Sequence, residues 1–253
     1  MKAALIQFNN VWESKRVNLD RAALLVERAA IEKCDVVVFP ELFATGFSMN
    51  IPVVADEGYG ETLSSLSSIA KKHAVNVIAG FAMKAPAENL ARNMAVVFDR
   101  KGRPGATYTK MHSFPLSEEG QHFMEGAETV VFDIDAMSST VFICYDLRFP
   151  ELFREVAARV KAMFVIANWP SERKEHWEIL LKARAIENQC FVIGVNRIGR
   201  DGNGILYPGA SRIIDPNGNV ICSGSDMEEF ITGEFDPSEA DRVRAALPFL
   251  KHI

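Results

Sequence analysis

The chain has 253 residues, of which 48% are hydrophobic and 24% are charged, and these proportions exclude a disordered, collagen-like or small disulfide-stapled protein. A chain of this length buries roughly 70–75% of the surface of its unfolded state, so a hydrophobic core can stabilise it without disulfides or metal. The net charge is −5 and no basic run occurs, which argues against nucleic acid or an anionic membrane as a partner.

The first third of the chain alternates between strands and amphipathic helices. Apolar residues recur at helical spacing in the helices, and the strands are short apolar or β-branched runs. This alternation predicts a largely parallel sheet with helices on its faces. The predicted elements are a strand over Ala3–Phe8, a helix reaching about Lys33, a strand over Asp35–Phe39, a helix ending near His73 and a strand over Val75–Ala82.

The middle of the chain is predicted to contain strands joined by turns. Strands over Asn93–Phe98 and Ala106–Tyr108 flank the turn Asp99–Gly102, which predicts a hairpin. Two further strands, Val130–Ile134 and Thr140–Cys144, follow that hairpin along the chain.

The last part returns to alternating helices and strands. Pro150 suits the start of a helix, and Ser238 suits the cap of a terminal one. Both halves share a coarse β-α-β-α-β rhythm, which would suit two sheets packed face to face in one α/β domain over residues 1–253. The predicted elements are a helix from Pro150 to about Lys161, a strand over Ala162–Ala167, a helix over Glu175–Asn188, strands over Phe191–Asn196, Arg212–Ile214, Val220–Ser223 and Phe230–Glu234, and a helix over Ser238–Ala246.

The sequence shows no sign of secretion, membrane insertion or metal binding. The N-terminal segment lacks the long apolar core of a secretory signal, and the longest apolar runs are far short of the ~20 residues that span a bilayer. No Cys/His cluster and no H-E-x-x-H motif occurs. The four cysteines, which form no C-x-x-C pair, are Cys34, Cys144, Cys190 and Cys222. We therefore expect a cytoplasmic protein with reduced thiols and no metal site.

Three apolar strands end abruptly in a reactive side chain. The segment VVVFPELF leads to Glu41, ATYTKMHSF contains Lys110, and STVFICYDLRFPELF leads to Cys144. In open α/β sheets, ligands bind at the carboxyl ends of the strands. Glu41, Lys110 and Cys144 are too far apart in sequence for local contact, so only the fold can bring them into one pocket.

These three residue types together fit one chemistry. An ionised cysteine is a strong nucleophile, a glutamate can act as its general base, and a lysine can stabilise a developing oxyanion. The set predicts covalent acyl transfer without a metal. Each residue alone also has an ordinary structural interpretation: Cys144 as a core residue, Glu41 as an exposed turn carboxylate and Lys110 as a solvated side chain.

The segments PELFATGFSM, YTKMHSF and CYDLRFPELFR resemble the three signature segments of the nitrilase superfamily of carbon–nitrogen hydrolases. The resemblance extends over nearly the whole chain, through ANWPSERKEHWEILLKARAIENQ and the VNRIGRDGNG that follows it. Within the superfamily, the chain most resembles ω-amidases of the short bacterial type. These enzymes hydrolyse the terminal amide of ω-amido 2-oxo acids such as 2-oxoglutaramate.

The resemblance implies a fold, an assembly and a set of catalytic roles. The fold is a four-layer α-β-β-α sandwich, and its subunits pair into a homodimer or a higher homo-oligomer. Cys144 matches the nucleophile, Glu41 the general base and Lys110 the catalytic lysine. The backbone N–H of Tyr145 matches the second oxyanion donor. The substrate is a small-molecule amide, and the reaction needs no cofactor.

A second glutamate of the family lies between the lysine and the cysteine. The segment SEEGQHFMEG offers both Glu118 and Glu119 for this position. We choose Glu119 from its distance to Gly126, with Glu118 as the alternative.

The substrate-binding side chains are less well marked by the sequence. An ω-amidase substrate carries a carboxylate away from its amide, and we expect Arg173 to bind it, with Arg148 and Arg197 as the next candidates. A solvated surface arginine is an equally good interpretation of Arg173. Trp169 follows a strand end, so it either shapes the acyl pocket or packs in the core. Arg148 and Asp146 are expected to form a buried ion pair that fixes the turn at the nucleophile.

Two alternatives to an ω-amidase remain open from the sequence. One is another activity of the superfamily, namely an aliphatic amidase, an N-carbamoyl amino acid hydrolase or a nitrilase. Nitrilases resemble Cys-Trp-Glu at the nucleophile, whereas this chain has Cys144, Tyr145 and Asp146. The other is a non-catalytic interaction protein on the same fold, against which the intact Glu41, Lys110 and Cys144 argue.

Overall fold

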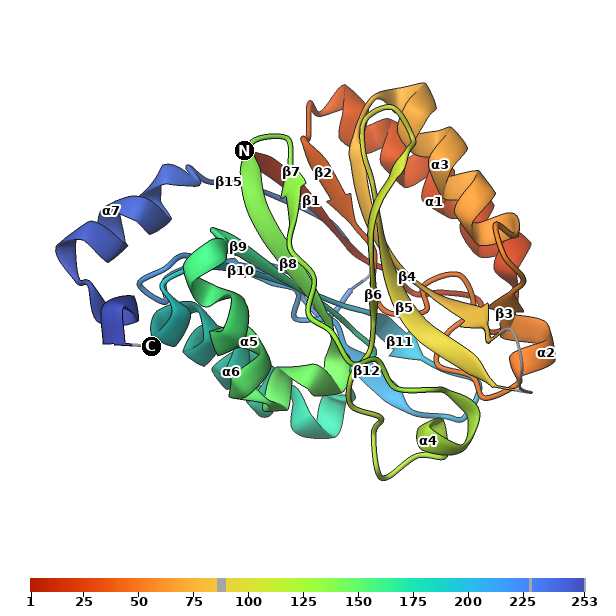
Figure 1. Cartoon of the computed structure of the whole chain (residues 1–253). Helices are drawn as coiled ribbons and strands as arrows, with labels where there is room; N and C mark the ends of the chain where they lie inside the picture. Colours follow the sequence, from red (N-terminus) through yellow and green to blue (C-terminus); the bar gives the residue numbers. More distant parts are fainter. Residues whose placement is uncertain (86–89, 228, 253) are drawn as a thin grey trace.

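Two β-sheets lie face to face in the computed structural model, which describes residues 1–85, 90–227 and 229–252 (Figure 1). The strand order of the first sheet is β15-β1-β2-β4-β5-β6, with β3 paired to β4. Its strands are β1 (Lys2–Gln7), β2 (Val36–Val38), β3 (Ala55–Asp56), β4 (Asn76–Lys84), β5 (Ala91–Phe98), β6 (Pro104–Thr109) and β15 (Glu229–Glu234).

The strand order of the second sheet is β14-β13-β10-β9-β8-β7. Its strands are β7 (Phe132–Ile134), β8 (Met137–Ile143), β9 (Ala162–Ala167), β10 (Phe191–Asn196), β13 (Arg212–Ile214) and β14 (Val220–Ser223). A separate two-stranded ribbon follows β10 and consists of β11 (Ile198–Arg200) and β12 (Leu206–Pro208).

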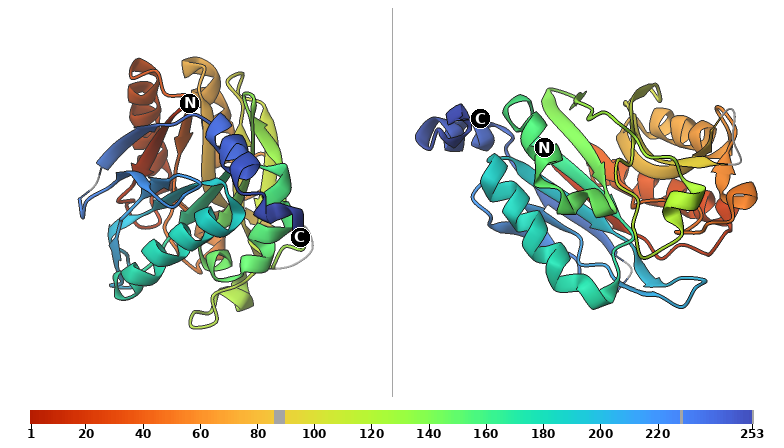
Figure 2. Two further views of the ribbon diagram at one scale, coloured as in Figure 1. Left: turned by 90° about the vertical axis from the view of Figure 1, so that its left-hand side faces the viewer. Right: turned by 60° about the horizontal axis from the view of Figure 1, so that its bottom comes forward.

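Helices cover the outer face of each sheet, which completes the four-layer sandwich (Figures 1 and 2). The first sheet carries α1 (Lys15–Ile31) and α3 (Glu61–His73), and the second carries α5 (Pro150–Val156) and α6 (Lys174–Asn188). The shorter helices are α2 (Ile51–Val54), α4 (Glu119–His122) and α7 (Ser238–Ala246). Figure 2 shows α7 at the end of the molecule remote from α1 and α3.

The strands of the first sheet are apolar on both faces because each face packs against another layer. In β1 and β2, the alternate residues Ala3, Leu5 and Val36 belong to the core between the two sheets. Their neighbours Ala4 and Val37 belong to a second core beneath α1 and α3. This period-two alternation between two buried surfaces produces the near-continuous apolar runs of the sequence.

The strand directions bring several carboxyl ends to one edge of the sandwich. Strand β2 is parallel to β1 and β4, and β6 runs the same way because two antiparallel pairings, β4–β5 and β5–β6, separate it from β4. In the second sheet, β8, β9 and β10 are mutually parallel. The segments that follow β2, β6, β8 and β9 therefore start from the carboxyl edges of the two sheets.

The structure corrects several local predictions. Strand β8 spans Met137–Ile143 rather than Thr140–Cys144, because Cys144 already belongs to a 3₁₀ turn. Strand β7 begins at Phe132 rather than Val130. The helix that starts at Pro150 ends at Val156 and continues as a 3₁₀ turn, Ala157–Arg159, because the Ala157 carbonyl accepts a hydrogen bond from Arg244 at 3.0 Å. A further correction concerns the predicted cap of the last helix, α7.

Ser238 does not cap α7. Its backbone N–H donates to Asp236 Oδ1 at 3.0 Å and its hydroxyl donates to Asp236 Oδ2 at 2.7 Å. Pro237 occupies the cap position, so the carboxylate of Asp236, rather than the hydroxyl of Ser238, accepts hydrogen bonds at this helix start.

No helix in the described part of the chain is long and apolar enough to cross a bilayer.

Candidate active site

The three reactive side chains named from strand ends lie at one edge of the sandwich. Glu41 lies in the turn that follows β2, Lys110 directly follows β6, and Cys144 opens a 3₁₀ turn, Cys144–Arg148, at the end of β8. Glu119 begins α4 and joins them. All four residues are buried, although their segments are far apart in the sequence.

Lys110 links the two carboxylates. Its Nζ lies 3.0 Å from Glu41 Oε1 and 2.9 Å from each oxygen of Glu119. Asn93, on the neighbouring strand β5, donates from Nδ2 to Glu41 Oε1 at 2.7 Å and to Glu119 Oε1 at 3.0 Å. One ammonium and one amide therefore hold both carboxylates in place.

Glu41 also accepts hydrogen bonds from Asn168, the residue at the end of strand β9 in the second sheet. The backbone N–H of Asn168, directly after β9, donates to Glu41 Oε2 at 2.8 Å. The side chain of Asn168 donates from Nδ2 to the Glu41 carbonyl at 2.8 Å and to Glu41 Oε2 at 3.2 Å. The turn bearing Glu41 lies directly against β4, where a Cβ added at Gly80 would come within 2.6 Å of the Glu41 Cα.

Cys144 has a left-handed backbone with φ of 49°. Residues in this sparsely populated region cluster at functional sites, and here the conformation sharply ends β8 and begins the 3₁₀ turn. The thiol donates to the backbone carbonyl of Asn168 at 3.8 Å. Asn168 therefore contacts both the nucleophile candidate and the base candidate.

Asp146 fixes the turn at Cys144, but not through the expected ion pair with Arg148. Its Oδ2 accepts hydrogen bonds from the Tyr108 hydroxyl at 2.9 Å and from the Ile143 N–H at 3.2 Å. Its Oδ1 accepts one from the His112 N–H at 3.0 Å. Because these donors already hold the buried carboxylate, Arg148 is left to face the cavity, with its guanidinium 4.8 Å from the Trp169 ring centre.

The charges of the site keep the thiol protonated at rest. Burial raises the pKa of Cys144 well above its usual value, and the Glu41 carboxylate adds to this against the opposing effect of Lys110. Burial alone would lower the pKa of Lys110, but Glu119 and Glu41 outweigh it and raise that pKa well above its ordinary range.

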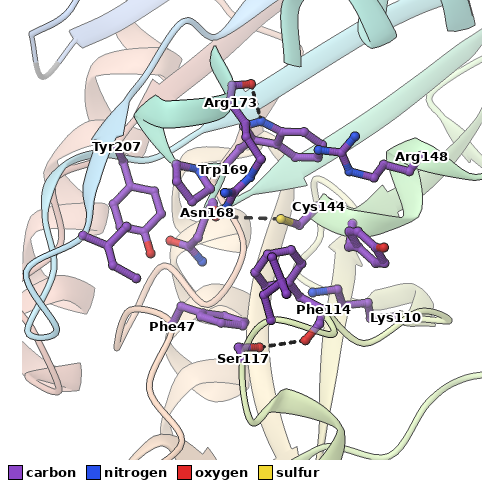
Figure 3. Close-up of a pocket in the computed structure, with 14 residues that line it drawn as sticks. Phe47, Lys110, Phe114, Ser117, Cys144, Arg148, Asn168, Trp169, Arg173 and Tyr207 are labelled. Carbon is purple, nitrogen blue, oxygen red and sulfur yellow. Dashed lines mark hydrogen bonds between the residues drawn. The ribbon is translucent and has the colours of Figure 1, made fainter. Parts of the chain in front are cut away.

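A small cavity of about 100 Å³ opens beside Cys144 (Figure 3). Its walls are mostly aromatic and aliphatic, and the cationic side chains among them are Lys110, Arg148 and Arg173. The volume is well below the roughly 300–1,000 Å³ of pockets for drug-sized ligands. The cavity therefore suits a small amide rather than a polypeptide.

The structure places Arg173, Trp169 and Tyr145 at this cavity as well. Arg173 lines it with a side chain that is 24% exposed, and its guanidinium lies 5.3 Å from the Phe114 ring centre. Trp169 is both a core and a lining residue, because it is buried and tilts against Trp177 at 5.7 Å. Tyr145 lines the cavity as well.

Arg197 and Glu118 lie elsewhere. Arg197 is fully buried over the Tyr207 ring and is not among the lining residues. The side chain of Glu118 is 72% exposed, whereas Glu119 is buried. Over the described ranges, no group of three or more His, Cys, Asp and Glu side chains is arranged to hold a metal ion.

Two polar residues of the site were not predicted from the sequence. Asn93 opens the predicted strand Asn93–Phe98 and Asn168 follows the predicted strand Ala162–Ala167, so periodicity treats both as strand-end polar residues. The only available signal for Asn168 was its position after Ala162–Ala167, which is the same strand-end pattern that identified Glu41 and Cys144.

The arrangement of thiol, carboxylate and ammonium agrees with the comparison to protein families. The model of the carbon-nitrogen hydrolase family matches residues 2–245. This chain belongs to the carbon-nitrogen hydrolase family. Carbon-nitrogen hydrolases act on non-peptide C–N bonds, and the enzyme class expected from the sequence is confirmed.

Individual relatives of this hydrolase align over almost its whole length. It is 35% identical to the 2-oxoglutaramate amidase of Bacillus subtilis, over 98% of this chain and 95% of the relative. It is 34% identical to the omega-amidase YafV of Escherichia coli K12, over 98% of this chain and 90% of the relative.

Solved structures confirm the predicted sandwich fold. A CN-hydrolase superfamily protein from Xanthomonas campestris, solved with an arsenic adduct in its active site, superposes with a TM-score of 0.94 at 29% identity, covering 100% of this chain and 97% of that one. Nit3 of Saccharomyces cerevisiae superposes with a TM-score of 0.89 at 28% identity, covering 98% of this chain and 94% of the other.

Proposed function

We propose that this carbon-nitrogen hydrolase removes the terminal amide of small ω-amido 2-oxo acids, with 2-oxoglutaramate as its substrate. The observation that carries the proposal is the pairing, in one small cavity, of Cys144 with two arginines, Arg148 and Arg173. An arginine fork binds a carboxylate through two parallel hydrogen bonds. Relatives named 2-oxoglutaramate amidase and omega-amidase, at 35% and 34% identity, support the same substrate class.

The first half of the reaction forms a thioester and releases ammonia. Glu41 accepts the thiol proton of Cys144 as the sulfur attacks the amide carbon, because a thiol with a raised pKa needs a base to become a nucleophile. Lys110 and the backbone N–H of Tyr145 hold the oxyanion of the tetrahedral intermediate. Glu41 then passes the proton to the nitrogen, the C–N bond breaks, and ammonia leaves.

The second half of the reaction consumes water. Glu41 takes a proton from a water molecule as its oxygen attacks the thioester carbon, and the C–S bond breaks. The proton on Glu41 returns to the departing sulfur of Cys144, so the free enzyme is regenerated. The sum is amide plus water giving acid plus ammonia, which balances without a redox or group-transfer cofactor. Glu119 positions Lys110 during both halves, because each of its carboxylate oxygens lies 2.9 Å from Lys110 Nζ.

Arg173 is proposed to bind the substrate carboxylate. Its nearest anionic partner is Glu172 at 3.6 Å, whose side chain is 87% exposed, so this ion pair is weak and easily exchanged for a ligand. Arg148 is held differently, with its guanidinium over Trp169 and Nη2 3.2 Å from Nδ1 of His176. Trp169 forms the adjoining apolar wall.

A substrate panel tests the proposal. Ammonia release is measured from 2-oxoglutaramate, glutamine, an N-carbamoyl amino acid and a short neutral amide at equal concentrations. We expect the highest kcat/KM for 2-oxoglutaramate. A higher value for the N-carbamoyl amino acid or the neutral amide would assign the enzyme to another branch of the family.

We further propose that the hydrolase is a cytoplasmic homo-oligomer that pairs through α6. Two isoleucines of this helix, Ile179 and Ile186, are 57% and 48% exposed, and exposed apolar side chains on one helix favour burial in an interface. The four cysteines are free thiols, which supports a reducing compartment. Light scattering at micromolar concentration should give at least the mass of a dimer, and a monomer would contradict the pairing.

A further inference from the structure

The side-chain oxygen of Asn168 has no role in the mechanism described above, although it is buried at the active-site cavity. Asn168 is 5% exposed and lines the cavity with Cys144 (Figure 3). Its Oδ1 has no hydrogen-bond partner in the protein. Buried polar atoms are nearly always hydrogen-bonded, so an unpaired acceptor at a ligand cavity needs an explanation.

The orientation of the Asn168 amide is set by its nitrogen. Nδ2 donates to the Glu41 carbonyl at 2.8 Å and to Glu41 Oε2 at 3.2 Å. Rotating the amide by half a turn would place Oδ1 against these two oxygens, which can only accept. The oxygen must therefore point away from Glu41, with its capacity to accept a hydrogen bond unused.

Asn168 differs in this respect from the other residues with unpaired buried atoms. Among the described residues, the side chains with such an atom that do not line the catalytic cavity are Asn10, Asn93, Thr140, Ser171, Asn188, Gln189 and Arg197. A buried side-chain oxygen that lacks a hydrogen-bond partner and belongs to a cavity-lining residue is thus particular to Asn168 within the described ranges.

The cavity offers few other acceptors to a ligand. Lys110, Arg148 and Arg173 can only donate, and the other side-chain acceptors of the lining are the hydroxyls of Ser117, Tyr145 and Tyr207. The carboxylate of Glu41 already accepts four hydrogen bonds, from Lys110, Asn93 and Asn168. An amide substrate gives its carbonyl oxygen to the oxyanion donors, and its NH₂ group then requires an acceptor.

We propose that Asn168 Oδ1 accepts a hydrogen bond from the NH₂ group of the substrate and thereby selects primary amides over the corresponding esters. This inference rests on the proposed amide hydrolysis. The selection depends on hydrogen-bond donors: a primary amide presents two N–H donors to Asn168 Oδ1, whereas the ester presents only acceptors at the same position. A site built to bind a donor disfavours an analogue that lacks it. Asn168 is in this sense a specificity-determining residue.

The test compares an amide with the matching ester. The kcat/KM values of 2-oxoglutaramate and of the ω-methyl ester of the same 2-oxo diacid are measured for the wild type and for Asn168→Ala. We expect the amide-to-ester ratio to fall by about 2- to 13-fold, as for the loss of one neutral hydrogen bond. An unchanged ratio would overturn the inference, whereas absence of turnover of both compounds by the wild type would instead contradict the proposed function.

Asn93→Ala is the matched control. Asn93 also donates from Nδ2 to Glu41, at 2.7 Å, but does not line the cavity. Loss of that donor should lower the rates for amide and ester together and leave their ratio at the wild-type value. A ratio that falls equally in Asn93→Ala and Asn168→Ala would show that the effect passes through Glu41, and it would also overturn the inference.

A binding measurement removes the dependence on catalysis and on the folding of the Asn168 variant. In Cys144→Ala, which keeps Asn168, calorimetry should show that the amide binds about 2- to 13-fold more tightly than the methyl ester. Adding Asn168→Ala to that background should equalise the two dissociation constants. Equal affinities in Cys144→Ala itself would contradict the inference.

Discussion

The ammonium of Lys110 is held by both carboxylate oxygens of Glu119, each at 2.9 Å. Glu119 is itself fixed, because its Oε2 accepts a hydrogen bond from the Phe114 N–H at 2.7 Å. The bidentate contact leaves Lys110 little freedom to move about its long side chain. A preorganised cation stabilises a developing oxyanion without reorganisation during the reaction.

Replacing Glu119 by Gln should therefore lower kcat more than it raises KM. The amide keeps the shape of the side chain but removes the charge that fixes Lys110, and misplacement of a catalytic group by about 1 Å can cost about 10²-fold in rate. Steady-state ammonia release measures both constants. Glu118→Gln, at a side chain that is 72% exposed, is the control and should keep the wild-type kcat. Equal losses in the two variants would refute the assignment of Glu119.

Replacing Glu41 by Gln should lower the pKa of Cys144. The Glu41 carboxylate is one of the causes that raise this pKa, and the cation of Lys110 remains in the variant. The thiolate absorbance is titrated as a difference between Glu41→Gln and Glu41→Gln/Cys144→Ala, which removes the other three thiols from the signal. The thiolate should appear at lower pH than in the wild type, while turnover falls by about 10²–10⁴-fold through loss of the base. A thiolate that appears at higher pH would contradict the charge arrangement described for the site.

Replacing Arg173 by Ala should weaken the use of charged amides. A hydrogen bond to a charged group contributes about 1.5–3 kcal/mol, so kcat/KM for 2-oxoglutaramate should fall roughly 10- to 150-fold, mainly through KM. The value for a short neutral amide should change little. Arg16→Ala, at a side chain that is 75% exposed, controls for the loss of surface charge. Equal losses on the two substrates would show that Arg173 does not bind the carboxylate, and Arg148 would be tested next.

Strand periodicity predicted much of the fold, because it reports which residues are buried. The predicted strand Asp35–Phe39 contains β2, and the predicted strand Ala162–Ala167 coincides with β9; both strands are buried on both faces. The ribbon of β11 and β12 was not predicted, since Gly199 and Arg200 in β11 and Pro208 in β12 leave neither strand with a continuous apolar run. Helix ends were misplaced where side chains from distant segments decide them, as Arg244 does at Ala157.

The candidate site was predicted unevenly for a similar reason. Glu41, Lys110 and Cys144 follow strands, so their convergence could be expected from the topology of α/β sheets. The contacts of Asn93 and Asn168 depend on which strands become neighbours across and between the sheets, and one sequence does not contain that information. The expected ion pair between Asp146 and Arg148 does not form, because Tyr108 and His112, from another segment, donate hydrogen bonds to the Asp146 carboxylate instead.

The central claim, a thioester formed on Cys144, is tested most directly by ammonia release from 2-oxoglutaramate in single cysteine variants. Cys222→Ala, at a half-buried thiol away from the cavity, should keep most of the wild-type rate and the wild-type melting temperature. Cys144→Ala should keep that melting temperature and lose turnover entirely, since no other lining residue offers a thiol. A folded Cys144→Ala variant that releases ammonia at more than a small fraction of the wild-type rate would contradict covalent catalysis by this residue.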